Sequence, residues 1–385
     1  MSGAAALLAL AALVSTLTAL ARLPSLQKLF RWLPLPLWCY LVPVLLTTAG
    51  FLSPNGPYKP AADTLLPMAL IVLLMSVDLR SVLQAGGSAL ASTAVGAAAV
   101  MAGTIIGVLL FRQWLPEQAW KGAGALAATW TGGTMNLLAM RTLLEPPEAV
   151  FAPLILVDAL VAYTWMAVLV AASTHQAALD RWLKADESRL KTAVAPLSGA
   201  PAAAATRSIG SVAATLGFAA LLTFLCRAAA ARLPKTLLTA SPTAWTVLLA
   251  TTAALLFGML PAAKRASSGA QGIGSFFLLI VLALAGAQAK LGALGAAAGW
   301  LGVGATVVAV HGISLIAFGK LRRIPLAILA TASQANIGGM VSAPIVGALY
   351  HPRLAAVGLL LAVGCNALGT YAGLVTAACC RWISG

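Results

Sequence analysis

The chain alternates between long apolar stretches and short polar connections. An apolar run of about 18 residues or more can cross the hydrocarbon core of a bilayer as a helix. Strands of a transmembrane barrel would instead alternate in pieces of roughly ten residues. The pattern therefore predicts an all-α integral membrane protein with about 10–12 transmembrane helices. The expected segments are Gly3–Ala21, Leu33–Leu52, Ala61–Val77, Gly86–Phe111, Ala119–Met140, Ala149–Ser173, Ile209–Ala230, Thr243–Leu260, Ile273–Gln288, Leu291–Phe318, Ile324–Leu349 and Leu354–Cys380.

Two of these apolar segments are interrupted by polar residues around a Gly-Gly pair. The first reads TWTGGTMN at Thr129–Asn136, and the second reads SQANIGGM at Ser333–Met340. Glycine in a helix interior costs roughly 1 kcal/mol relative to alanine. In lipid, an unwound turn survives only where it is buried in protein or lines a cavity. We therefore expect two broken helices at a cavity. The alternative is that the glycines only allow close helix packing.

The two interruptions belong to a wider internal similarity. Gly338 follows Gly132 by 206 positions, and at the same offset Val157-Asp158 corresponds to Val363-Gly364. Matches in the same order at nearly one offset indicate a duplication. We expect a first repeat at 1–173, a charged and Ala/Pro-rich linker at 174–208, and a second repeat at 209–385, with the broken helices near 129–136 and 333–342. Breaks at equivalent places favour inverted repeats. Parallel repeats stay open, because the number of crossings in each half is not fixed by the sequence.

The linker itself has two parts of different composition. Its charged part, Asp180–Lys191, predicts a short amphipathic helix at the membrane interface. The Ala/Pro-rich part that follows is typical of a flexible spacer.

Composition excludes several classes of protein. Hydrophobic residues make up 61% of the 385 residues and charged residues only 9%, which leaves little material for a domain outside the membrane. The formal net charge of +15 comes from Lys and Arg in short connections, the pattern that orients membrane proteins, and so predicts no nucleic-acid partner. The five cysteines form no C-x-x-C pair, and no catalytic constellation is present. We expect neither an enzyme nor a bound metal or cofactor.

The residues around the breaks are the candidate site. Neutral oxygens suit a dehydrated Na⁺, and the N-terminus of a half-helix favours an anion. An aspartate inside an apolar helix is a functional hypothesis by default, as a cation ligand or a proton carrier, and the alternative is a buried structural carboxyl group. A lone histidine such as His311 is more simply a packing residue. The candidate ion ligands are Thr131, Asn136, Asp158 and Asn366. The candidate solute ligands are Trp130, Gly132, Gly133, Thr134, Gln334, Asn336, Gly338, Gly339 and Ser342.

Together, TWTGGTMN and ASQANIGGMVSAP resemble the signature segments of the YjcL-like family of integral membrane proteins. The resemblance covers nearly the whole chain, including Asp158 and the closing helix with Asn366. It implies the superfamily of cation:proton antiporters and Na⁺-coupled anion symporters. That superfamily implies inverted repeats and a core in which two broken helices cross at the site for ion and solute. The family pattern has Asn where Gln334 stands and Pro where Met340 stands, which implies a changed site volume.

These observations lead to one main functional hypothesis. We expect a multi-pass secondary transporter that moves a small solute, with an organic anion as the first choice, coupled to Na⁺ or H⁺. The alternative is a membrane scaffold or regulatory protein that keeps the transporter fold without transport. The expected partners are the lipid bilayer and a small-molecule or ion substrate, and a homodimer stays open. Whether the membrane is the plasma membrane or an organellar one is not decided by the sequence.

Overall fold

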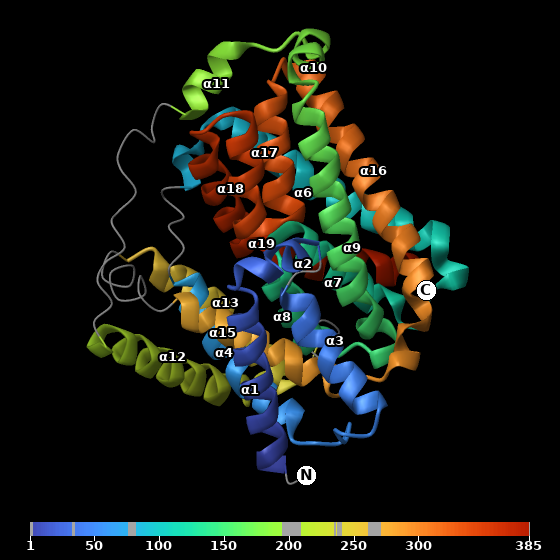
Figure 1. Ribbon diagram of the computed structural model, residues 1–385, viewed down its shortest axis with the longest axis vertical. Helices are drawn as coiled ribbons and strands as arrows, with labels where there is room; N and C mark the ends of the chain where they lie inside the picture. The colour runs from blue at the N-terminus through green and yellow to red at the C-terminus, as the bar shows by residue number, and fades with distance from the viewer. Residues whose placement is uncertain are drawn as a thin grey trace.

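The computed structural model describes residues 3–32, 35–75, 82–194, 209–234, 236, 241–260 and 271–384. Within these ranges the chain is helical and contains no β-strand (Figure 1). The Ala/Pro-rich part of the predicted linker, 195–208, lies outside them.

Each of the twelve expected apolar segments contains a helix. Six helices are long and apolar enough to cross a membrane, which makes this a multi-pass integral membrane protein. They are α1 (Gly3–Leu20), α6 (Gly87–Phe111), α9 (Glu148–Ser173), α12 (Ile209–Ala230), α16 (Ala297–Arg322) and α19 (Leu354–Ser384). The remaining segments form shorter helices, namely α3 (Leu35–Thr48), α4 (Tyr58–Leu74), α13 (Pro242–Gly258), α15 (Gln271–Gly286) and the two consecutive pairs α7 (Ala119–Gly132) with α8 (Thr134–Leu144) and α17 (Leu326–Ile337) with α18 (Gly339–Tyr350).

Local sequence explains several of the helix ends. α13 begins after Ser241, whose Oγ accepts from the N–H of Ala244 at 3.2 Å, and Pro242 occupies its first position. α8 ends at Leu144, where Glu145 is left-handed (φ 45°) and two prolines follow. Proline cannot continue a helix that has begun before it, because it lacks the N–H donor. These signals divide the apolar chain into separate helices.

The helices form two groups. The first group contains α1, α3, α4, α12, α13 and α15, which pack on one another. The second group contains α6 to α9 and α16 to α19. The first group lies in the lower part of Figure 1, and most of the second group lies above it. α8 packs against α13, and α3 packs against α9, so the two groups meet in the middle of the molecule.

Glycines bring helices of the second group close together. A methyl group at Gly103 of α6 would lie 2.9 Å from Cα of Val307 in α16, and one at Gly107 would lie 3.0 Å from Cα of Val303. Residue numbers rise along α6 while they fall along α16, so the two helices run antiparallel. Small residues at such an interface let the backbones approach, which is a common packing device in membranes.

The charged part of the linker folds onto the second group. Two short helices, α10 (Gln176–Leu183) and α11 (Glu187–Val194), stand where one short helix is predicted. Asp180 Oδ1 accepts from the N–H of Leu326 at 2.7 Å, and the N–H of Asp186 donates to the carbonyl of Arg323 at 2.8 Å. The linker is therefore tied to the corner between α16 and α17. The division of the chain into two repeats stays a prediction.

Candidate functional site

Both Gly-Gly pairs interrupt a helix, as the sequence predicts. α7 ends at Gly132, Gly133 has φ +87°, and α8 begins at the next residue. α17 ends at Ile337, and Gly339, with φ +73°, begins α18. Residues with a Cβ rarely adopt these positive φ values, because Cβ crowds the backbone there. Glycine at Gly133 and Gly339 thus allows the chain to leave one half-helix and enter the next.

The two breaks lie against each other. A methyl group at Gly339 would lie 3.9 Å from Cα of Gly133. Beside them is a cavity of about 280 Å³, lined by both breaks together with residues of α3, α4, α9, α15 and α19. The cavity thus lies between the two helix groups, and most of its lining is apolar, with side chains such as Leu37, Ile155 and Leu278. A space of this size accommodates a small solute.

The electrostatic character of the cavity comes from few groups. Among the lining residues Asp158 carries the one carboxylate, and the described lining includes no Lys, Arg or His. The first residues of α8 and α18 also line the cavity, and the leading N–H groups of a helix have no partner within the helix. Each N-terminus therefore contributes a partial positive charge. The cavity offers one carboxyl group and two partial positive charges.

Asp158 lies in the middle of α9 and is partly accessible from the cavity. The hydroxyl of Thr129, in the last turn of α7, donates to Asp158 Oδ1 at 3.3 Å. Thr129 is absent from the predicted site, although it belongs to the same polar segment. Tyr163 and Ser275 also line the cavity and are likewise absent from the prediction. A tyrosine or serine inside an apolar run gives no local signal of which face it occupies.

Gln334 lines the cavity from α17. Its Nε2 donates to Ser342 Oγ at 2.8 Å, which links the last turn of α17 to the first turn of α18 across the break. Its Oε1 is buried and has no hydrogen-bond partner among the described residues. Gly338 lies directly beneath this bridge, since a methyl group there would be 1.8 Å from Gln334 Nε2.

Asn136 is turned away from the cavity into the packing between α8 and α19. Its Nδ2 donates to the carbonyl of Gly132 at 2.9 Å and to Asn366 Oδ1 at 3.2 Å. Its Oδ1 accepts from Thr370 Oγ1 at 2.6 Å. Asn136 is only 2% exposed, so its amide serves the contact between helices and does not line the cavity.

Asn336 is also turned away, onto α6. One orientation of its amide lets the nitrogen donate to the carbonyls of Ala332 at 3.0 Å and Thr93 at 3.3 Å. A methyl group at Gly96 would lie 2.7 Å from Asn336 Oδ1, so the side chain fits only because Gly96 has none. Asn336 holds α17 against α6.

The structure thus separates the thirteen predicted site residues into two sets. Trp130, Thr131, Asn136 and Asn336 are buried outside the cavity lining. The ring of Trp130 packs on Gly304 of α16, and Thr131 Oγ1 is buried with no partner in the part of the chain that the structure describes. Those brought together at the cavity are Gly132, Gly133, Thr134, Asp158, Gln334, Gly338, Gly339, Ser342 and Asn366.

His311 lies at the contact of four helices away from the cavity. Its Nδ1 faces the carbonyl of Gly96 at 3.0 Å, and a carbonyl only accepts, so Nδ1 carries the proton. Its Nε2 then accepts from the hydroxyl of Ser333 at 2.8 Å, and that oxygen accepts from Trp165 Nε1 at 2.8 Å. Every polar atom of this group has a partner with His311 neutral. The arrangement favours the packing role over a proton role.

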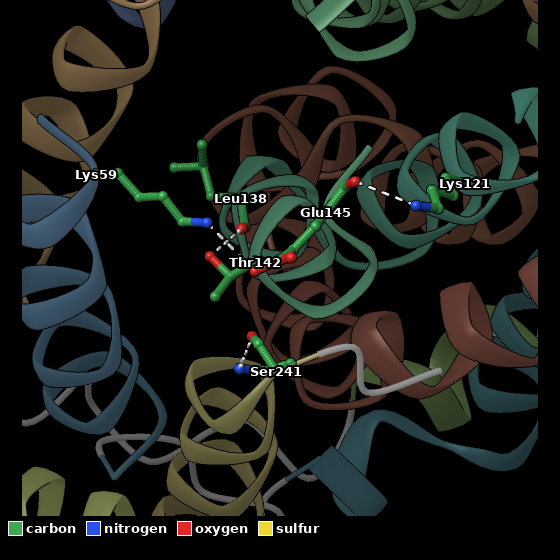
Figure 2. A network of polar contacts seen from close by, with 7 residues as sticks. Lys59, Lys121, Leu138, Thr142, Glu145 and Ser241 are labelled. Carbon is green, nitrogen blue, oxygen red and sulfur yellow. Dashed lines mark hydrogen bonds and ion pairs between the residues drawn. The ribbon is translucent and has the colours of Figure 1, made fainter. Parts of the chain in front are cut away.

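A second polar network joins the two helix groups at the other end of α8. Lys59 of α4 pairs with Glu145 Oε1 at 3.4 Å, and Lys121 of α7 donates to the carbonyl of Glu145 at 3.2 Å (Figure 2). Both Lys59 and Glu145 are well exposed to the surface, and exposed pairs contribute little to stability. The network marks where α4 and α8 approach each other outside the cavity.

Metal-binding side chains are few in the part of the chain that the structure describes. Among the described residues no group of three His, Cys, Asp or Glu side chains is placed to hold a metal ion. Divalent cations such as Ca²⁺ take six to eight oxygen ligands with several carboxylates. Asp158 is the one carboxylate of the described cavity lining, and Thr129 is its hydrogen-bond donor.

Fold and site together define a multi-pass helical membrane protein with two interrupted helices that meet at a small cavity. The chain belongs to the family described as "Protein of unknown function (DUF819)", whose model matches residues 5–383. The match thus covers nearly the whole chain. No curated protein matches it.

Proposed function

We propose that the protein is a secondary active transporter that moves a small organic anion, coupled to Na⁺ or H⁺. The observation that carries the proposal is the meeting of the two glycine breaks at the cavity that contains Asp158. Unwound backbone at such depth in a membrane protein is found where it lines a binding site.

The charges of the cavity support a cation together with an anion. The carboxylate of Asp158, with Thr129 donating to one of its oxygens, attracts a cation or a proton. The N-termini of α8 and α18 attract the anion, because the peptide dipoles of a helix leave a partial positive charge at its N-terminus. The absence of Lys and Arg from the described lining favours a solute with a single carboxylate over a multiply charged one.

The arrangement of the two halves supports an inverted repeat. α6 and α16 occupy corresponding places before the two broken helices, and their glycine contacts show that they run antiparallel. Parallel repeats would place corresponding helices in the same direction. This is the architecture implied by the superfamily of cation:proton antiporters and Na⁺-coupled anion symporters, in which one helix group moves against the other around a central site.

Uptake into proteoliposomes tests the proposal against the alternative of a scaffold that keeps the fold. The purified protein is reconstituted, and accumulation of small radiolabelled carboxylates is measured with and without an inward Na⁺ or H⁺ gradient. We expect uptake that requires one of the gradients and is lost in Asp158→Asn. Asn336→Ala is the control for a buried polar residue outside the cavity, and it retains the gradient dependence. Folded protein without gradient-driven uptake of any carboxylate would favour the scaffold.

A further inference from the structure

The chemistry of Gln334 limits which carboxylates fit the cavity. We infer that the solute carries a hydrogen-bond donor, a hydroxyl or an ammonium group, next to its carboxylate, and that Gln334 Oε1 accepts from this donor. The inference rests on the proposed function and names the class of solute for the same site.

Gln334 has a hydrogen-bond acceptor without a donor in the described part of the chain. Gln334 is 1% exposed, and its Nε2 is engaged by Ser342, while its Oε1 has no donor among the described residues. Leaving a buried polar atom without a partner costs about 1–3 kcal/mol. Because the side chain lines the cavity, a solute in the cavity can supply the missing donor. The terminal amide torsion is broad, so a small rotation turns the oxygen toward the solute.

The amide of Gln334 lies beside the start of α18. Gly338 has no side chain, and a methyl group placed there would lie 1.8 Å from Gln334 Nε2 and 2.1 Å from Ser342 Oγ. The amide therefore rests directly on the backbone at the start of α18. A carboxylate held by the leading N–H groups of α18 lies beside this amide. The donor that reaches Oε1 must then be attached close to the carboxylate, as in a 2-hydroxy or 2-amino acid.

A buried acceptor of this kind also makes a binding site selective. A site that hydrogen-bonds a hydroxyl or amine of its substrate rejects the analogue without that group, because the buried acceptor stays unpaired. A 2-keto acid would be rejected for the same reason, since it presents a second acceptor to Oε1. A tenfold change in affinity corresponds to about 1.4 kcal/mol. An unpaired buried acceptor costs about this much or more, so we expect about a tenfold preference or more for the acid that carries the donor.

Competition against uptake, or direct binding to the purified protein, tests the inference with four probes of similar size: propionate, pyruvate, lactate and alanine. We expect lactate or alanine to bind about tenfold or more tightly than propionate and pyruvate. The comparison of lactate with alanine distinguishes the hydroxyl from the ammonium group. In Gln334→Met, which keeps the length of the side chain but removes the acceptor, the preference should disappear.

Two further variants keep the test decisive. Ser342→Ala releases Gln334 Nε2, so the amide loses its fixed orientation and the preference should weaken even if Gln334→Met folds poorly. Asn336→Ala, which changes a buried amide on the opposite side of α17, should retain the preference. Equal binding of propionate, lactate and alanine by the wild type overturns the inference and leaves the proposed function intact. A preference that persists in Gln334→Met also overturns it. Absence of gradient-driven uptake of any carboxylate counts against both.

Discussion

The break at Gly133 and the break at Gly338–Gly339 are similar in sequence but differ in what surrounds them. At the first break, Gly132 is enclosed by backbone, since a methyl group there would lie 2.7 Å from the carbonyl oxygen of Cys365 in α19. At the second break, the atoms nearest to a methyl group at Gly338 belong to the side chains of Gln334 and Ser342. Equivalent glycines thus serve helix packing in one half and a side-chain bridge over the cavity in the other.

Similar polar segments in the two halves thus supply different groups to the site. The first half supplies the carboxylate at Asp158, and Val363-Gly364 stands at the corresponding place in the second half. The second half supplies Gln334 as a cavity-facing amide. On this account the cation binds closer to the first half, and Gln334 acts mainly on the solute.

The largest effect on the fold is expected from Gly132→Ala. The added methyl group meets backbone of α19 that cannot move independently, so the free energy of unfolding should fall by about 1–3 kcal/mol. In the matched change Gly338→Ala, the nearest atoms are movable side-chain ends. This change should therefore cost less than about 1 kcal/mol while separating Gln334 from Ser342. Thermal unfolding in detergent, together with solute binding, measures both. Equal loss of stability in the two variants would contradict the comparison.

The next effect concerns the two asparagines. Asn136→Ala strands the hydroxyl of Thr370 and the amide of Asn366, and should lower the free energy of unfolding by about 1–3 kcal/mol. Asn336→Ala should cost less, because the carbonyls left behind belong to regular helix. Neither side chain lines the cavity, so solute affinity should change less than in Gln334→Met. If either variant lost solute binding while its stability stayed unchanged, that asparagine would belong to the site.

How much of this was accessible from the sequence depends on how local each signal is. The positions of the apolar helices and the breaks at Gly133 and Gly339 follow from local physical chemistry and are predicted correctly. Of the twelve expected membrane-spanning segments, six contain a described helix that is long enough to cross a membrane. The direction of a side chain depends on how a helix is rotated against its neighbours. Gln334 and Asn336 are two residues apart and point about 200° apart around the helix. One faces the cavity and the other faces α6, and no local pattern decides which.

The same limit explains the residues that the sequence prediction lacks. Thr129 becomes relevant only because α7 packs against α9 and brings its hydroxyl to Asp158. Ser275 reaches the cavity from the first helix group, more than a hundred residues away in sequence from Asp158. Such contacts depend on tertiary packing, which the periodicity of apolar residues in a single sequence does not reveal.

The smallest effect is expected from Ser188→Ala, a substitution in the linker outside the membrane that should leave both breaks unchanged. Hydrogen bonds from the side chain and the backbone N–H of Ser188 lower the pKa of Asp186 below its ordinary value. The stability that these hydrogen bonds contribute is therefore present when the pH is above the ordinary pKa of the carboxyl group. It is lost as the pH falls through the lowered pKa. In Ser188→Ala the pKa of Asp186 should rise, as a carboxyl NMR titration would show. An unchanged pKa would contradict this assignment, and solute binding at neutral pH should be unaffected.

The most direct test of the central claim is the linkage between cation and solute at the cavity. If both bind there, Na⁺ or H⁺ must raise the affinity for the solute, and the solute must raise the affinity for the cation by the same factor. Calorimetric binding to the purified protein measures this factor for the wild type and for Asp158→Asn, which keeps the shape of the side chain and removes its charge. We expect a clear linkage in the wild type and none in Asp158→Asn. Linkage that survives intact in folded Asp158→Asn would contradict it.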